Sequence, residues 1–174
     1  MAALISRDLG VVHAFYADLR DRYDPGKPLW VTETADAGCG GNPWASTFLD
    51  TFRYLNQQGR LAQQGVQMIA HNTLAASDYG LLDEKTFMPR PNYWGAVLWR
   101  RLMGNIVLKP GPVREDDLYL YAHCMRDRSG GVTVLAINAG PTAPGSGRPD
   151  RRRALYSHGE GTREQGRSTE RTRD

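Results

Sequence analysis

The sequence is poor in cysteine, has no long hydrophobic run and carries little net charge. Its two cysteines, Cys39 and Cys124, are too few for a disulfide framework and lack the CxxC or Cys/His spacing of a zinc site. No apolar run approaches the roughly 20 residues that span a bilayer, so we expect no membrane span. The first residues lack the apolar core of a secretory signal and include the acidic Asp8, which such signals exclude.

Neither nucleic acid nor a cofactor is predicted as a partner. Residues 148–174 hold eight of the 22 basic and five of the 19 acidic residues, and therefore the whole formal charge of +3. The rest of the chain is neutral, so the basic balance is weak support for nucleic-acid binding. The glycine-rich segment 38–41 is not followed by the Lys-Ser/Thr pair of a phosphate-binding loop. We expect no metal and no cofactor.

The remaining composition is that of a globular protein, with 40% hydrophobic and 24% charged residues among 174. Apolar spacing and breaker residues predict an alternation of helices and strands, which is typical of a parallel α/β sheet. The predicted segments are a helix ending near Tyr23, a buried strand Leu29–Glu33, a helix capped by Asn42 and broken near Gly59, a buried strand Val66–His71, and a helix capped by Asn92 and ended by Gly104.

The pattern changes after residue 104. Segments 106–108, 118–124 and 132–137 have strand character without intervening helices, which favours a separate antiparallel unit. From Gly140 onward there is almost nothing to bury, so we expect a disordered basic tail over residues 140–174. Two strand–helix units cannot close a barrel of about 250 residues, and we therefore interpret the chain as a fragment.

Glu33 is the first candidate catalytic residue. It ends a predicted buried strand, directly before the glycine-rich loop, where functional side chains of α/β folds lie. A carboxylate here can serve as the nucleophile of a glycoside hydrolase, and the glycines would let a sugar approach the backbone. The alternative is a glutamate that caps or pairs with a loop.

The second predicted strand ends in a similar way. Asn72 follows it, and Ser77, Asp78 and Tyr79 lie in the loop beyond. Asn72 can bind a sugar hydroxyl, and Tyr79 offers a ring face and a phenol. Each of these residues is also an ordinary loop former, so the alternative of a purely structural role remains open.

Several motifs together resemble the heparanase and β-glucuronidase family, glycoside hydrolase family 79. The resemblance extends over about residues 10 to 139, in matching order and spacing. It is carried by Trp30-Val31-Thr32-Glu33-Thr34 with the following Gly-Cys-Gly-Gly, Asn72 to Asp83, Pro91-Asn92-Tyr93-Trp94, Leu98 to Gly104, Tyr121-Ala122-His123-Cys124 and Ala136-Ile137-Asn138.

The resemblance implies a retaining glycosidase with a (β/α)₈ barrel and a C-terminal β-sandwich. Residues 1–104 would be the C-terminal part of the barrel with its last two strand–helix units, and residues 105–139 the first strands of the sandwich. Glu33 would be the nucleophile at the end of strand seven, and Val66 to Asn72 would form strand eight. The residues implied to bind a substrate with β-linked glucuronic acid are Gly40, Gly41, Asn72, Ser77, Asp78 and Tyr79, with the phenol of Tyr79 and loop amides holding the carboxylate.

The chain departs from the family pattern in one chemically important respect. The family's general acid/base is a glutamate after an asparagine, and no Asn-Glu pair occurs in this sequence. We therefore expect the chain alone to be inactive as an enzyme, although the parent enzyme is expected to be secreted or extracytoplasmic. Two alternatives remain: a glycosidase for a neutral sugar, such as a xylosidase or arabinofuranosidase, and a non-catalytic truncated fragment.

Overall fold

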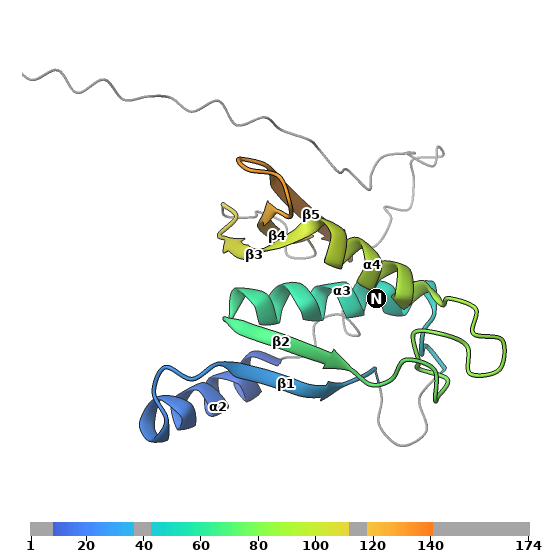
Figure 1. Ribbon diagram of the computed structural model, residues 1–174, viewed down its shortest axis with the longest axis horizontal. Coiled ribbons are helices and arrows are strands. Elements are labelled where there is room, and N and C mark those ends of the chain that lie inside the picture. Colours follow the sequence, from blue (N-terminus) through green and yellow to red (C-terminus); the bar gives the residue numbers. More distant parts are fainter. Residues whose placement is uncertain (1–8, 37–42, 112–117, 141–174) are drawn as a thin grey trace, which may run out of the picture.

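The computed structural model describes residues 9–36, 43–111 and 118–140, and these residues form a mixed helix and strand structure (Figure 1). The α/β class is thereby confirmed. The predicted tail, apart from Gly140, and the glycine-rich loop lie outside the described residues. The elements in chain order are α2 (Leu9–Tyr23), β1 (Leu29–Thr34), α3 (Phe48–Gln63), β2 (Val66–His71), α4 (Pro91–Leu102), β3 (Met103–Leu108), β4 (Leu118–Met125) and β5 (Val132–Asn138).

The first sheet pairs β1 and β2 in parallel. Leu29 lies opposite Val66 at one end and Thr34 opposite His71 at the other, so both strands finish at the same edge. The strands were correctly predicted, but their expected burial is wrong, since the side chain of Trp30 is 58% exposed. No third strand pairs with this sheet in the described ranges, so both of its strands are edge strands there.

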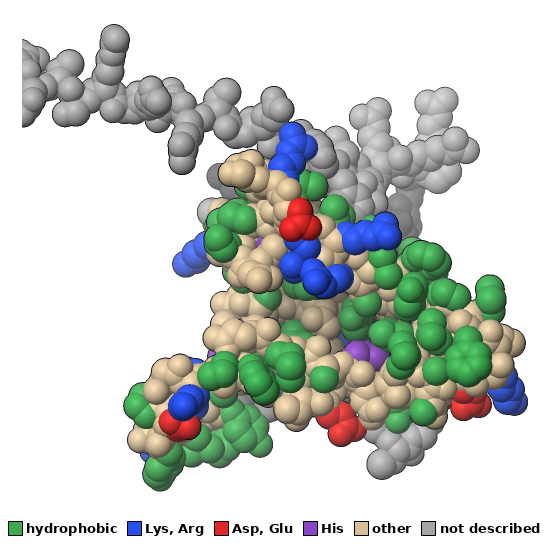
Figure 2. All heavy atoms as spheres, in the orientation of Figure 1, with side chains coloured by type: hydrophobic (Ala, Val, Ile, Leu, Met, Phe, Trp, Pro, Cys, Tyr) green, Lys and Arg blue, Asp and Glu red, His purple; other side chains and the backbone are tan. Residues whose placement is uncertain are grey.

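Figure 2 shows the consequence on the molecular surface. Hydrophobic side chains gather over α2 and β1 at the lower left of this view, and over the segment before α4 at the right. The large exposed hydrophobic side chains of these regions are Phe15, Tyr16, Tyr23, Trp30, Leu74, Phe87 and Met88, and Trp94 in α4 is exposed as well. Such exposure is unusual for a monomer that is complete by itself.

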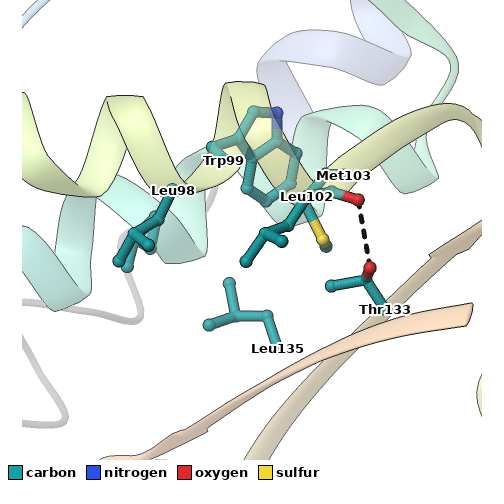
Figure 3. A pocket seen from close by; sticks show the side chains of 7 residues that line it. Leu98, Trp99, Leu102, Met103, Thr133 and Leu135 are labelled. Atoms are coloured by element: carbon teal, nitrogen blue, oxygen red, sulfur yellow. Dashed lines mark hydrogen bonds between the residues drawn. The ribbon is translucent and has the colours of Figure 1, made fainter. Parts of the chain in front are cut away.

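The second sheet is antiparallel, with the order β3-β4-β5, as the strand pattern after residue 104 predicted. Helix α3 runs between the two sheets and contacts both of them (Figure 1). The buried core lies where α3 and α4 meet the second sheet, around Met103, Tyr121 and Ile137. Figure 3 shows the side of this core at which Trp99 and Leu102 of α4 face Leu135 of β5, and the Thr133 hydroxyl donates to the Leu102 carbonyl at 3.0 Å.

Both predicted helix caps are wrong. Helix α3 begins after Thr47, whose hydroxyl accepts a hydrogen bond from the Asp50 amide at 3.2 Å. Helix α4 begins at Pro91, after Arg90. Asn92 lies inside the first turn and is fully buried. Its burial is tolerated because its side-chain amide donates to the Asp50 carboxylate at 2.5 Å. Asparagine here joins two helices instead of capping one.

Gly59 was predicted to break a helix, which is wrong, and Gly104 to end one, which agrees with the end of α4 at Leu102; both glycines also permit close packing. Helix α3 continues past Gly59 to Gln63, and a Cβ at Gly59 would lie 2.3 Å from Cγ of Tyr121 on β4. Gly104 belongs to β3, where a Cβ would lie 2.3 Å from the carbonyl oxygen of Cys124. A side chain at Gly59 would therefore push Tyr121 and its sheet away from α3, and one at Gly104 would separate β3 from β4 within the sheet.

Candidate active site

The parallel register brings Glu33 and Asn72 together at the shared end of β1 and β2. The Asn72 backbone amide donates to the Thr34 carbonyl at 2.8 Å, which continues the sheet beyond its last paired residues. The Asn72 side-chain Nδ2 then donates to Oε1 of Glu33, also at 2.8 Å. The Glu33 side chain is exposed, and no ion pair to it occurs in the described residues. Glu33 therefore presents an oriented carboxylate to the exterior.

Asn72 was predicted to bind a sugar hydroxyl, and the structure gives its side chain an additional partner. One Nδ2 proton is used by Glu33, while the other proton and the Oδ1 acceptor have no partner among residues 9–36, 43–111 and 118–140. Contact with a sugar hydroxyl therefore stays a prediction. Orientation of the Glu33 carboxylate is a role that the sequence did not indicate.

A series of hydrogen-bonded polar side chains on α3 supports the end of β1. The Gln57 side chain donates to the Thr34 hydroxyl at 2.7 Å, and Arg53 donates to Gln57 at 3.4 Å. Arg53 also forms an ion pair with Asp50, which is 1% exposed. Burial of these groups is tolerated because they bond to one another. Their spacing of three and four residues is the helical signal that could have identified this polar buried face.

The loop after β2 forms a fixed turn over residues 77–80. The Gly80 amide donates to the Ser77 carbonyl at 3.0 Å. His71 and Ser46 secure the same turn from below: His71 Nε2 bonds to the carbonyl of Tyr79 at 3.2 Å, and the Ser46 hydroxyl donates to the carbonyl of Gly80 at 3.1 Å. The side chain of Tyr79 is half-buried. These hydrogen bonds fix the backbone of the turn that carries it.

Arg90 holds the first half of the turn. Its Nη1 donates to the Ser77 carbonyl at 3.1 Å and also to the Asp78 carbonyl, and its Nη2 donates to the Asp83 carboxylate at 3.1 Å. The Asp83 pKa lies well below its ordinary value, chiefly because Asp83 accepts from the Thr86 amide, with further bonds from the Thr86 hydroxyl and Arg90. The carboxylate therefore remains charged opposite Arg90 far into the acid range.

His71 provides a pH test of the loop. Burial lowers its pKa from 6.5, the Tyr79 bond raises it and nearby Arg53 lowers it, while Asp50 and Asp36 raise it more weakly. Because a carbonyl can only accept, Nε2 carries the proton of the Tyr79 bond, and acid must protonate Nδ1. Nδ1 is buried without a hydrogen-bond partner in the described part of the chain.

We expect the free energy of unfolding to fall as the pH drops below 6.5. The unfolded His71 takes up a proton there while the folded one resists, so its contribution is complete above 6.5 and is lost toward the lower folded pKa. The slope from this single proton cannot exceed about 1.4 kcal/mol per pH unit. Urea unfolding of wild type and His71→Gln between pH 5 and 8 measures it. An identical slope in the variant would show that His71 is not responsible.

The structure thus brings together only part of the predicted site. Glu33 and Asn72 are in direct contact, and Ser77, Asp78 and Tyr79 share the loop that follows β2. Gly40 and Gly41 lie outside the described residues. Within residues 9–36, 43–111 and 118–140, no three His, Cys, Asp or Glu side chains are grouped to hold a metal ion, and no helix is long and apolar enough to cross a membrane.

Comparison with known proteins identifies relatives for two thirds of the chain. No protein-family model matches. Heparanase-like protein 1 of Arabidopsis thaliana is 41% identical over 117 residues, which are 67% of this chain and 21% of that protein. Baicalin-beta-D-glucuronidase of Scutellaria baicalensis is 39% identical over 110 residues, 63% of this chain and 21% of that protein.

A third relative is named as an inactive protein. Inactive heparanase-2 of Homo sapiens is 32% identical over an alignment 133 positions long, which covers 67% of this chain and 22% of that protein. The chain therefore spans about a fifth of the length of the curated relatives it matches.

Proposed function

We propose that this chain, whose matched residues are homologous to the heparanase and β-glucuronidase family, carries the nucleophile of a retaining glycosidase that acts on β-linked glucuronic acid. The homology confirms the resemblance that the sequence motifs indicated and supports glycoside hydrolysis of the glucuronide type. Within the proposal, residues 1–104 are the last part of a (β/α)₈ barrel and residues 105–139 begin a β-sandwich.

The observation that carries the proposal is the pairing of Glu33 with Asn72 at the end of two parallel strands. In a parallel barrel, catalytic side chains occupy this edge. Attack on C1 of a sugar requires an ionised carboxylate with an accessible oxygen. The bond from Asn72 occupies one oxygen of Glu33 and leaves the other available, which supports a role as nucleophile.

Uronate recognition is assigned to the loop after β2. Tyr79 supplies a phenol there, and the backbone amides around Ser77 and Asp78 supply further donors in a turn that is fixed from several sides. Fixed neutral donors suit a carboxylate because they need no reorganisation when the anion binds. Gly40 and Gly41 stay in the proposal only as substrate-binding residues implied by the family resemblance.

Retaining hydrolysis needs a second carboxyl group, and the Asn-Glu pair that supplies it in the family does not occur in this sequence. Retaining hydrolysis uses two carboxyl groups about 5 Å apart, one of which protonates the leaving oxygen. Leaving groups as acidic as dinitrophenol depart without that proton. The inactivity expected from the sequence therefore applies in this proposal to substrates that need a protonated leaving group: the chain should fail on alkyl glucuronides but release dinitrophenolate slowly from an activated glucuronide.

Two alternatives differ from the proposal in ways that experiments can distinguish. A neutral-sugar glycosidase would share the Glu33 chemistry but not the carboxylate contact of Tyr79. A non-catalytic role is consistent with the relative named Inactive heparanase-2. Total failure to release dinitrophenolate would favour this second alternative.

Tyr79→Phe distinguishes the glucuronide proposal from a neutral-sugar enzyme. Loss of the phenol removes a hydrogen bond to the substrate's charged group, so we expect kcat/KM on dinitrophenyl β-glucuronide to fall about tenfold or more. On dinitrophenyl β-xyloside, which lacks the carboxylate, the change should be less than about threefold. Tyr23→Phe, at an exposed tyrosine on α2, is the matched control. Equal losses on both substrates would contradict uronate recognition.

A further inference from the structure

We infer that Arg90 is a positioning residue for uronate binding: by holding the carbonyls of Ser77 and Asp78, it turns the amide N–H groups of Asp78 and Tyr79 outward as a pair of donors for a sugar carboxylate. This inference rests on the proposed function and adds to it a residue that does not itself touch the sugar. No motif of the sequence analysis singled out Arg90.

The direction of the two N–H groups follows from peptide geometry. In a trans peptide the carbonyl and the amide of the same plane point in opposite directions. Both peptides, Ser77–Asp78 and Asp78–Tyr79, are trans, and both carbonyls are directed at Arg90. The amides of Asp78 and Tyr79 therefore point away from the guanidinium. Neither amide has a hydrogen-bond acceptor in the part of the chain that the structure describes.

The neighbouring carbonyls reinforce this arrangement. The carbonyl of Tyr79 bonds to His71 and that of Gly80 to Ser46, so the carbonyls of residues 77 through 80 all face side-chain donors. Because protein donors occupy these carbonyls, the amides of Asp78 and Tyr79 remain as the donors that the turn can offer to an anion. Arg90 is the one of these donors that holds two carbonyls at once.

Arg90 is not itself free to bind the uronate. Its Nη1 is used by the two carbonyls and its Nη2 by Asp83, whose charge offsets that of the guanidinium. Its side chain is 19% exposed. The backbone of Arg90 is fixed as well, because its amide donates to the Leu81 carbonyl at 2.9 Å. The planar guanidinium places Nη1 at the two carbonyls and Nη2 at Asp83 at the same time, an arrangement that the single nitrogen of a lysine ammonium does not reproduce.

NMR titration of the full ¹⁵N-labelled chain tests the inference without requiring turnover. Methyl β-glucuronide and methyl β-xyloside are added separately to wild type, Arg90→Met and Arg90→Lys, with Arg101→Met as a control at an exposed arginine of α4. In wild type, glucuronide should bind more tightly than xyloside and shift the amide signals of Asp78 and Tyr79. Arg90→Met should weaken glucuronide at least about tenfold, leave xyloside within about twofold and abolish those amide shifts.

The possible outcomes separate the two claims. Unchanged glucuronide affinity in Arg90→Met, together with a loss in Tyr79→Phe, would overturn the role of Arg90 and leave the proposed function standing. Wild type that binds glucuronide no more tightly than xyloside would overturn the proposed function itself. Should Arg90→Met unfold, Arg90→Lys decides: selective weakening of glucuronide supports the role of Arg90, whereas wild-type affinity or an equal loss for both sugars overturns it.

Discussion

Replacing Glu33 with alanine is expected to reduce dinitrophenolate release from dinitrophenyl β-glucuronide by at least about 100-fold, or roughly 2.7 kcal/mol of transition-state stabilisation. The activated leaving group requires no general acid, so the loss reports the nucleophile alone. Initial rates followed by absorbance, with wild type and variant at equal concentration, measure it. The effect should be large because the exposed carboxylate at the end of β1 is the group that the proposal assigns to bond formation with C1.

Azide provides a second measurement on the same variant. The alanine leaves space where the carboxylate stood, and azide can attack C1 from that side. Restored dinitrophenolate release should therefore be accompanied by an α-glucuronyl azide, which has the inverted configuration. Loss of release without restoration by azide would indicate that Glu33 supports the site structurally rather than reacting with the sugar.

Glu33→Gln and Glu84→Ala serve as matched variants. Glutamine retains an oxygen that can accept the bond from Asn72, so it preserves the packing at the strand ends while removing the charge. It should be as inactive as alanine, and azide should restore it less well because the space is filled. Glu84 is an exposed glutamate of the loop before α4 and should be replaceable without effect. Activity retained in Glu33→Gln would contradict the proposed nucleophile.

The sequence predicted the regular elements well because each has a local signal. Apolar and β-branched runs marked β1 and β2, and the change of pattern after residue 104 marked the second sheet. The strand ends then placed Glu33 and Asn72 at one edge, which is where they lie. Parallel pairing and local periodicity are sufficient for this part of the site.

The remaining features depend on contacts between distant residues. Arg90 lies 12 residues after Asp78, and nothing local indicates that its side chain folds back onto that carbonyl. Similarly, asparagine is a residue type that often caps helices, but the side chain of Asn92 forms hydrogen bonds with Asp50 and Thr51 of another helix. Local preference was overridden in each case by a hydrogen bond formed only after the helices pack.

The requirement for glycine at position 59 likewise depends on a contact between distant residues, and it has the largest expected energetic effect. In the sequence Gly59 is a helix breaker, since glycine costs about 1 kcal/mol relative to alanine within a helix. In the structure it is the point at which α3 lies against the ring of Tyr121, which is 3% exposed and donates a hydrogen bond to Asn56. The helix accepts a poor residue there because a side chain would displace the ring.

Gly59→Ala is therefore expected to destabilise the protein, although alanine is the better helix former. Its Cβ would lie 2.3 to 2.4 Å from Cγ and both Cδ atoms of Tyr121, at the base of the ring, where rotation of the side chain gives no relief. Overpacking of this kind costs about 3 kcal/mol, which exceeds the helical gain. We expect urea unfolding to show this loss and thermal unfolding to show a midpoint about 10 °C lower.

Gly95→Ala on α4 is the matched control, because its Cβ would lie 3.1 Å from a methyl group of Thr51, which can give way slightly. Its stability should stay within about 1 kcal/mol of wild type. Tyr121→Leu removes the ring, and in that background the cost of Gly59→Ala should fall by more than about 1 kcal/mol. An equal cost of Gly59→Ala with and without the ring would mean that backbone distortion in α3, and not contact with β4, sets the requirement for glycine.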